Sequence, residues 1–406
     1  MKINRVICGT LLAGAAAVAI PGFAQRSPDS GPIARYDMRA GTTSGMGGMG
    51  QINPMALMMG GGMGGQVQHE LLLRLGSSNT PDKGKAKADH FMPSGAKLGK
   101  SVALSTPNVD PYFKEDLPTE PRGRILLYWG CGEHAPTGQP VVIDLANLAK
   151  GSVPEGLYNS AIVRDWGPTL QNSTTFGHWP SQDGKYVKAD SSLLGAHRIA
   201  GNYSPDISFN LTKDFMSPLQ VSVAGQASGA SLLSWTGIAD ATGYVASLFG
   251  AKNGPDGDAM DLVMWSSSST RQFGSWYSDW LSPGQVAPLV KDKTILSPET
   301  TSCTVPAEVL RDAPDFRVGT LNAFGPEENF SYPPRPDDAS TPWNLQWTAR
   351  VRHRSITNWM EAEGISMGTA NDSFGEAQGQ EQPQCKPKRG GMFGGIMGGI
   401  LGGNGC

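Results

Sequence analysis

The densest group of reactive side chains in this sequence is Cys131, Glu133 and His134, within the run Trp-Gly-Cys-Gly-Glu-His at 129–134. A thiolate beside an imidazole can form a nucleophilic site, and the same two groups can bind a metal. A nucleophile needs an orienting partner and a metal needs further ligands, yet no paired CxxC and no HExxH motif supplies them. We therefore favour a disulfide at Cys131 in a glycine-rich turn, and keep a hydrolase site near Cys131–His134 as the alternative.

Four other residues have side chains suited to acid–base chemistry, and they would act together with one of the many serines. No Walker loop and no HExxH motif occur after the first 24 residues. The absence of these motifs lowers the case for an enzyme without removing it. The four residues are Asp165, His178, Asp190 and His197.

A methionine-rich tract offers a different chemistry. Thioethers are soft ligands, so in an oxidising compartment this tract would suit Cu(I). Histidine and cysteine co-ligands are missing from it, and its many glycines are typical of a disordered linker, which is the interpretation we favour. The candidate ligands are Met46, Met49, Met55, Met58, Met59 and Met63.

The C-terminal tail repeats Gly-Gly every four residues. In a helix this period puts glycines on one side and apolar residues on the other, as in closely packed membrane helices. The basic residues Lys386, Lys388 and Arg389 precede the repeat and suit an anionic membrane surface. Glycine is a poor helix former and the run is short for a span, so a loose tail is the favoured alternative to membrane association or self-association. The repeat positions are Gly390, Gly394, Gly398 and Gly402.

The first 24 residues are typical of a secretory signal peptide. Lys2 and Arg5 precede an apolar run, and the segment ends in Gly22-Phe23-Ala24 with a small residue at the cleavage position. The chain is therefore expected to be exported, to the periplasm or to the outer membrane and cell surface. Net charge is −3 and no basic face stands out, which argues against a nucleic-acid partner.

Four cysteines remain after removal of the signal peptide: Cys131, Cys303, Cys385 and Cys406. Exported thiols usually pair, and four cysteines allow three connectivities that spacing alone does not separate. Cys131 and Cys303 fall in predicted folded modules, and the other two fall in the tail. The first expectation is therefore folded-with-folded and tail-with-tail pairing, although a tail cysteine can instead link two chains.

Composition and strand patterns predict a mainly β fold, with two β-sandwich-like modules between disordered Gly/Met-rich ends. Gly (53) and Pro (30) are too frequent for a helical bundle, and charged residues make up only 17%. The runs 124–129 and 345–353 are typical of strands, the second by strict alternation. We expect six parts: a signal peptide (1–24), a Gly/Met-rich disordered region and linker (25–89), a β-rich domain (90–215), a sandwich (216–310), strands completing the core (311–362), and a polar, then Gly-rich tail (363–406).

The segment 231–248 carries a recognisable pattern, in which a strand ending in Trp235 leads through Ala-Thr-Gly-Tyr at 241–244 into the next strand. It resembles the fibronectin type III family, which implies an immunoglobulin-like sandwich over residues 217–310 with Trp235 between its sheets. Such a fold implies no particular function. The succession HFMPSGAKLG, YWGCG and GQPVVID is also similar to exported sphingomonad-type proteins of unknown function, which implies an envelope setting.

Together these patterns predict an exported, envelope-associated binding or structural protein without catalytic activity. Its partner would be another envelope protein or a surface component, with possible membrane association through the tail. No cofactor is expected. The alternatives are a secreted hydrolase with a site near Cys131–His134, and soft-metal (copper) binding by the methionine tract.

Overall fold

The computed structural model describes residues 31–46, 67–107, 123–150, 165, 167–181, 187–253, 260–272, 280–338, 340–362, 365–367 and 369. The expected signal peptide and the glycine-repeat tail lie outside these residues. Within them the chain is mainly β, as the sequence predicts, and forms sheets of ten, four and three strands.

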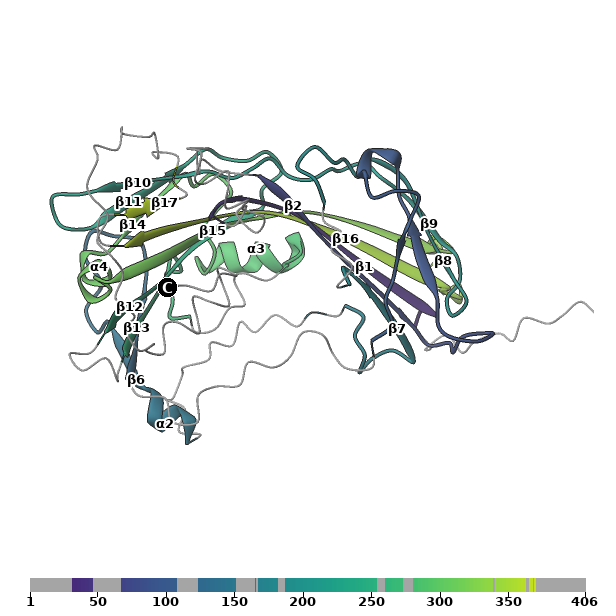
Figure 1. Cartoon of the computed structure of the whole chain (residues 1–406), viewed down its shortest axis with the longest axis horizontal. Coiled ribbons are helices and arrows are strands. Elements are labelled where there is room, and N and C mark those ends of the chain that lie inside the picture. Colours follow the sequence, from purple (N-terminus) through teal and green to yellow (C-terminus); the bar gives the residue numbers. More distant parts are fainter. Residues whose placement is uncertain are drawn as a thin grey trace, which may run out of the picture.

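The ten-stranded sheet runs through the whole described part of the molecule and is arched (Figure 1). Its longest strands, β15 (Phe316–Tyr332) and β16 (Trp347–Ala362), pair antiparallel in its middle. β1 (Ala34–Gly45) pairs parallel with β16. On the β15 side, the sheet continues in order with β12 (Gly243–Asn253), β13 (Met260–Ser266), β5 (Arg124–Trp129) and β6 (Val141–Asp144). On the β1 side, it continues with β2 (Gln68–Ser77) and β7 (Thr175–Trp179). The tenth strand, β17 (Ile365–Met367), pairs with β16.

Two small sheets cover one face of this sheet, which we call the outer face. Trp347 and Val351 of β16 lie in one core and Trp359 in the other, and these alternate positions share a face. The molecule is therefore two sandwiches that share one long sheet. The four-stranded sheet is β4 (Val102–Ala103), β3 (Ala88–Phe91), β8 (Gly195–Gly201) and β9 (Ile207–Leu211); the three-stranded sheet is β10 (Val221–Gly225), β11 (Ser231–Trp235) and β14 (Ser302–Val305).

On the opposite, inner face, α3 (Pro283–Lys291) lies under the arch (Figure 1). Val286 and Leu289 of α3 pack against Val245 and Phe324 of the sheet. The helix begins at Ser282 with a capping box, which satisfies amide groups that the first turn leaves unpaired. The other short helices are η2 (Ser94–Ala96), α2 (Leu145–Ala149) and α4 (Ala307–Asp312).

The segment between β9 and β10 crosses the outer face from one sandwich to the other. Buried hydroxyl groups of the shared sheet hold it there: Thr42 Oγ1 donates to the Met216 carbonyl (2.6 Å), and Ser355 Oγ donates to the Ser217 carbonyl (2.8 Å). The Leu219 amide donates in turn to Ser355 Oγ (3.1 Å). These bonds satisfy the backbone of a segment that supplies no strand of its own.

Two strands fall where the sequence suggested a disordered linker. Within the range 25–89, Ala34–Gly45 forms β1 and Gln68–Ser77 forms β2, both in the ten-stranded sheet. The expectation of a disordered region and linker is therefore wrong for these two stretches, which are ordered strands. Their apolar residues alternate on one face, with Tyr36 and Leu73 among those buried, but the Gly/Met tract between them dominates the local composition.

The strands of the range 216–310 are divided between two sheets. β10, β11 and β14 form the three-stranded sheet, whereas β12 and β13 lie in the ten-stranded sheet beside strands from other parts of the chain. Trp235 is 6% exposed and its ring centroid lies 5.6 Å from that of Tyr244, so the predicted burial of Trp235 between two sheets is confirmed.

Cys131 and Cys303 form a disulfide, with their Cα atoms 5.3 Å apart. It joins the turn after β5 to β14, and so ties the ten-stranded sheet to the three-stranded one. This is the pairing expected first for the folded modules. Cys385 and Cys406 lie outside the described residues.

Candidate binding site on the inner face

Charged residues occupy the inner face of the central strands β1 and β16. Asp37 and Arg39 alternate with buried apolar residues on β1, and Arg350 and Arg352 do so on β16. The parallel register places Asp37 opposite Arg350 and Arg39 opposite Arg352. Alternate residues of a strand share a face, so all four side chains project away from the outer cores.

Asp37 accepts hydrogen bonds from three guanidinium groups. Nη2 of Arg352 lies 2.9 Å from both carboxylate oxygens, Nε of Arg39 lies 2.9 Å from Oδ2, and Nε of Arg350 lies 3.0 Å from Oδ1. Asp37 is 1% exposed and Arg352 is 2% exposed. Buried charges are costly unless they are paired and hydrogen-bonded, and both conditions are met here.

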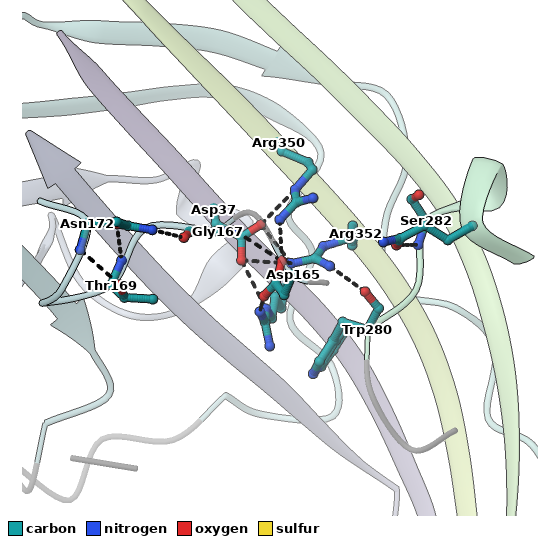
Figure 2. Close-up of polar contacts among 11 residues, drawn as sticks. Asp37, Asp165, Gly167, Thr169, Asn172, Trp280, Ser282, Arg350 and Arg352 are labelled. Atoms are coloured by element: carbon teal, nitrogen blue, oxygen red, sulfur yellow. Dashed lines mark hydrogen bonds and ion pairs between the residues drawn. The ribbon is translucent and has the colours of Figure 1, made fainter. Parts of the chain in front are cut away.

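A second carboxylate, Asp165, contacts the same three guanidinium groups (Figure 2). Nη2 of Arg350 lies 2.8 Å from Oδ1 of Asp165, and Arg352 Nη2 lies 3.3 Å from the same oxygen. Arg39 Nη2 donates to the other oxygen, Oδ2. We call these five residues, Asp37, Asp165, Arg39, Arg350 and Arg352, the arginine–aspartate cluster.

The cluster keeps both carboxylates ionised. Burial acts to raise the pKa of Asp37, but the guanidinium groups of Arg352, Arg39 and Arg350 outweigh it and lower that pKa. The same three guanidinium groups also outweigh burial at Asp165 and lower its pKa well below the usual value. A general acid at neutral pH needs a raised pKa, so neither carboxylate is suited to donate a proton. Their role is to hold the guanidinium groups in place.

The cluster is also tied to the segment that leads into α3. Nη1 of Arg352 donates to the Trp280 carbonyl, and the guanidinium of Arg354 lies 4.0 Å from the centroid of the Trp280 ring. Nη2 of Arg354 lies 2.7 Å from Glu70 on β2. Figure 2 shows Trp280 and Ser282 on the side of the cluster away from Asn172. Strands and helix are thus fixed to each other by charged groups as well as by apolar packing.

Two cavities open near the cluster and share the side chain of Arg35. The first, of about 380 Å³, is bordered by Asp37, Arg350 and Trp343, among others. The second, of about 560 Å³, is bordered by Gln171 and other polar residues. We call the two cavities together the Arg35 groove. Its volume is in the range of pockets that bind small molecules.

The loop 167–174 forms a wall of both cavities. Its first residues, Gly167 and Pro168, border the first cavity, and residues 171–174 border the second. Asn172 braces the loop, since its Nδ2 donates to the Gly167 carbonyl (2.9 Å) and its Oδ1 accepts from the Thr169 amide (2.8 Å) (Figure 2). Arg35 Nη2 donates to the Asn172 carbonyl (2.8 Å), which joins the loop to β1.

The structure separates the residues that the sequence grouped near Cys131. Cys131 is disulfide-bonded, so in this state its sulfur is not a thiolate. The side chain of His134 is 67% exposed, and its Nδ1 lies 3.1 Å from Glu308 Oε1. The described residues therefore show the expected disulfide, and show His134 beside a carboxylate instead of a thiolate.

The four other residues considered for acid–base chemistry lie in different surroundings. Asp165 belongs to the arginine–aspartate cluster, and exposed Asp190 forms an ion pair with Lys97. His178 lies on β7, and His197 lies on β8 in the outer core. The sequence singled out Asp165, but for hydrolysis with histidines instead of for its contacts with arginines.

His197 belongs to a buried chain of hydrogen bonds. Tyr36 Oη lies 2.7 Å from His90 Nδ1, His90 Nε2 lies 2.9 Å from His197 Nδ1, and His197 Nε2 lies 2.7 Å from the Leu193 carbonyl. Because a carbonyl only accepts, each imidazole in this chain donates through Nε2 and accepts through Nδ1, which is a neutral arrangement. Burial lowers the pKa of both His90 and His197.

The candidate metal and membrane residues fall mainly outside the described part of the chain. Met46 is described and directly follows β1. The other candidates lie outside the described residues: Met49, Met55, Met58, Met59, Met63, Gly390, Gly394, Gly398 and Gly402. The residues that the structure describes contain no group of three or more His, Cys, Asp or Glu side chains able to hold a metal ion. None of the helices among them is both long and apolar enough to cross a membrane.

Sequence reasoning missed most of the arginine–aspartate cluster, although one signal for it was present. Arg350, Arg352 and Arg354 recur at every second position of a strand whose other face is apolar. Arginines at a strand's spacing on a half-buried element indicate that carboxylates or a ligand meet them. Asp37 and Arg39 have the same spacing but stand beside the low-complexity tract.

No protein-family model matches this sequence, and a search of curated proteins finds no match.

Proposed function

We propose that this chain is an exported binding protein of the cell envelope that acts without catalysis and takes its ligand on the inner face of the shared sheet. The observation that carries the proposal is the threefold hydrogen bonding of Asp37 by Arg39, Arg350 and Arg352. It holds the guanidinium groups beside the Arg35 groove in fixed positions. A binding site gains affinity when its polar groups are fixed before the ligand arrives.

The charge state of the cluster favours binding over acid–base catalysis. Asp37 and Asp165 both have lowered pKa values, so they stay ionised through the neutral range. A pair of carboxylates that hydrolyses a glycosidic bond needs one member with a raised pKa. A hydrolase near Cys131 would need a thiolate, and the disulfide to Cys303 occupies that sulfur.

Two features support the envelope setting. The first 24 residues have the pattern of a signal peptide, and the Cys131–Cys303 disulfide fits an oxidising compartment. We also propose that the glycine-repeat tail attaches the protein to the membrane surface or to another copy. Copper binding by the methionine tract stays a prediction, to be tested by Cu(I) titration of the mature protein.

The tail proposal is tested by membrane fractionation of the full mature protein and of a chain ending at Gln384. We expect the full protein to sediment with membranes and the shortened one to stay soluble. Replacing Gly394 and Gly398 by Leu keeps the tail apolar but blocks close helix contact, so it separates self-association from simple partitioning. If full and shortened proteins partition alike as soluble monomers, the tail has no anchoring role.

The binding proposal is tested by thermal melting of the mature protein with polysaccharide, lipid and peptide fractions of the cell envelope. A ligand that binds only the folded state raises the melting temperature by mass action. Thr348→Trp fills the first cavity and should abolish that rise, whereas Asn210→Trp, on the exposed side of β9, should keep it. The effective fraction should be recovered chemically unchanged. Turnover of that fraction, or an equal rise in the Thr348→Trp variant, would contradict the proposal.

A further inference from the structure

We infer that the Arg35 groove is a site for an acidic oligosaccharide, a short chain of pyranose rings bearing carboxylates. This inference rests on the proposed binding function and specifies its ligand. Two cavities of about 380 and 560 Å³ are both bordered by Arg35 and by parts of a single braced loop. Successive cavities with a common border suit a ligand made of linked units better than a single compact molecule.

The lining of the groove matches the hydrogen-bonding groups of a sugar. Sugar hydroxyls both donate and accept, and protein amides and hydroxyls offer both functions at short range. Amide and hydroxyl side chains border both cavities: Asn329, Ser331 and Thr348 in the first, and Ser78, Gln171 and Ser173 in the second. The second cavity, whose lining is mainly polar, is poorly suited to a lipid tail, which has no polar groups to pair with it.

Trp343 gives the first cavity an aromatic wall. Its indole Nε1 donates to the Pro333 carbonyl (3.0 Å), and the Arg335 guanidinium lies 6.0 Å from the ring centroid, so the ring is held from two directions. The face of an indole carries negative charge density. The C–H groups on one side of a pyranose ring are weakly positive, so a sugar ring can pack against such a face while its hydroxyls reach the polar wall.

The charge of the groove selects an acidic sugar. Arg35 borders both cavities, and among the described residues it forms no ion pair, since its hydrogen bond goes to the Asn172 carbonyl. Among the residues that border the groove, guanidinium groups outnumber carboxylates by two to one. A planar guanidinium can bind a carboxylate through two parallel hydrogen bonds. The two guanidinium groups are those of Arg35 and Arg350, and the carboxylate is that of Asp37.

Isothermal titration of the mature protein with trigalacturonate tests the inference, with maltotriose as a neutral chain of equal length. We expect trigalacturonate to bind, and its affinity to fall as ionic strength rises, because charged contacts are screened by salt. Maltotriose should bind about tenfold more weakly or worse, the loss expected for one charge-assisted hydrogen bond.

Matched variants locate the site. Arg35→Met and Trp343→Ala should each raise the Kd for trigalacturonate about tenfold. Arg198→Met, on β8 of the outer sheet, and Trp129→Ala, at the end of β5, should leave it unchanged. Unaltered melting temperatures for Arg35→Met and Trp343→Ala would show that the loss is local.

Each other outcome overturns a stated part of the inference. Equal binding of maltotriose excludes an acidic ligand, and unchanged affinity in both groove variants excludes the site. Absence of trigalacturonate binding overturns the inference altogether. The proposed binding function is judged separately, by the envelope-fraction experiment with Thr348→Trp, so its failure and this one are distinguishable.

Discussion

Asp37 and Arg352 lie 315 positions apart in the sequence, yet Nη2 of Arg352 lies 2.9 Å from both oxygens of the Asp37 carboxylate. This contact joins β1 to β16, neighbouring strands that come from opposite ends of the described chain. Pairing of segments so far apart in the sequence carries a large loop-closure entropy cost, which the contacts between them must offset. The buried ion pair therefore fixes which strands are neighbours and which residues face the groove.

Replacing Asp37 by Asn should lower the free energy of unfolding by about 3–5 kcal/mol, because it leaves buried guanidinium groups without their partner. Guanidinium-chloride denaturation at neutral pH measures the loss. Asp206→Asn is the matched control, since it breaks the ion pair with Arg198, in which both side chains are more than half exposed. That change should cost less than about 1 kcal/mol. A loss for Asp37→Asn no larger than the control would show that the cluster adds nothing to stability.

Strand β16 could be predicted from the sequence, whereas β1 could not. In 345–353 an apolar residue stands at every second position, and Trp347, Ala349 and Val351 are buried as this alternation predicts. β1 contains the same alternation, but it is followed by glycines and methionines that indicate a linker. Which strand lies beside it depends on contacts with β16, more than 300 positions away, and such contacts leave no local signal.

The candidate site was less predictable than the fold. Asp165 attracted attention as an acid, but the groups that lower its pKa lie on β1 and β16, and neither spacing nor composition connects those strands to it. The Cys131–Cys303 bond could be predicted, because these two cysteines fall in predicted folded modules and the other two fall in the tail. The fibronectin type III likeness of residues 217–310 stays a prediction.

Trp235→Ala should lower the free energy of unfolding by about 3–5 kcal/mol, since it removes a large aromatic side chain from a packed core. Trp235 is 6% exposed and packs beside Tyr244 between the ten- and three-stranded sheets. Chemical denaturation measures the change, and Trp235→Phe serves as the conservative comparison with a smaller loss. An unfolding free energy unchanged by Trp235→Ala would mean that the ring contributes little to this core.

Thiol counting on the denatured, unreduced mature protein should give zero or two free thiols. Cys131 and Cys303 are bonded, and the count depends on whether Cys385 and Cys406 are also paired. The bond closes a loop of 172 residues, so reduction should lower the free energy of unfolding by about 2–5 kcal/mol. A count of four would exclude the disulfide in the exported protein.

Stability should fall as pH drops below about 6.5, the ordinary pKa of histidine. In the chain from Tyr36 through His90 and His197 to the Leu193 carbonyl, every ring nitrogen has a partner while both rings are neutral, and burial disfavours adding a proton to either ring. Burial accordingly lowers the folded-state pKa of both rings. Between the folded and unfolded pKa values the unfolded chain binds more protons, so the free energy of unfolding decreases with falling pH.

A second decrease in the free energy of unfolding should begin below about pH 4, where the carboxylates of the unfolded chain take up protons. Asp37 and Asp165 have lowered folded-state pKa values, so the stability that they contribute is complete above the unfolded value and disappears as pH falls through the folded one.

Denaturation curves between pH 7.5 and 5 isolate the histidine window. There His90→Gln should reduce the slope by up to about 1.4 kcal/mol per pH unit, the value for one proton. His134→Gln, whose side chain is 67% exposed in the native protein, should keep the slope. An equal slope in the wild type and in His90→Gln would show that the buried chain tolerates the proton, and that its neutral arrangement does not control the acid sensitivity of the fold.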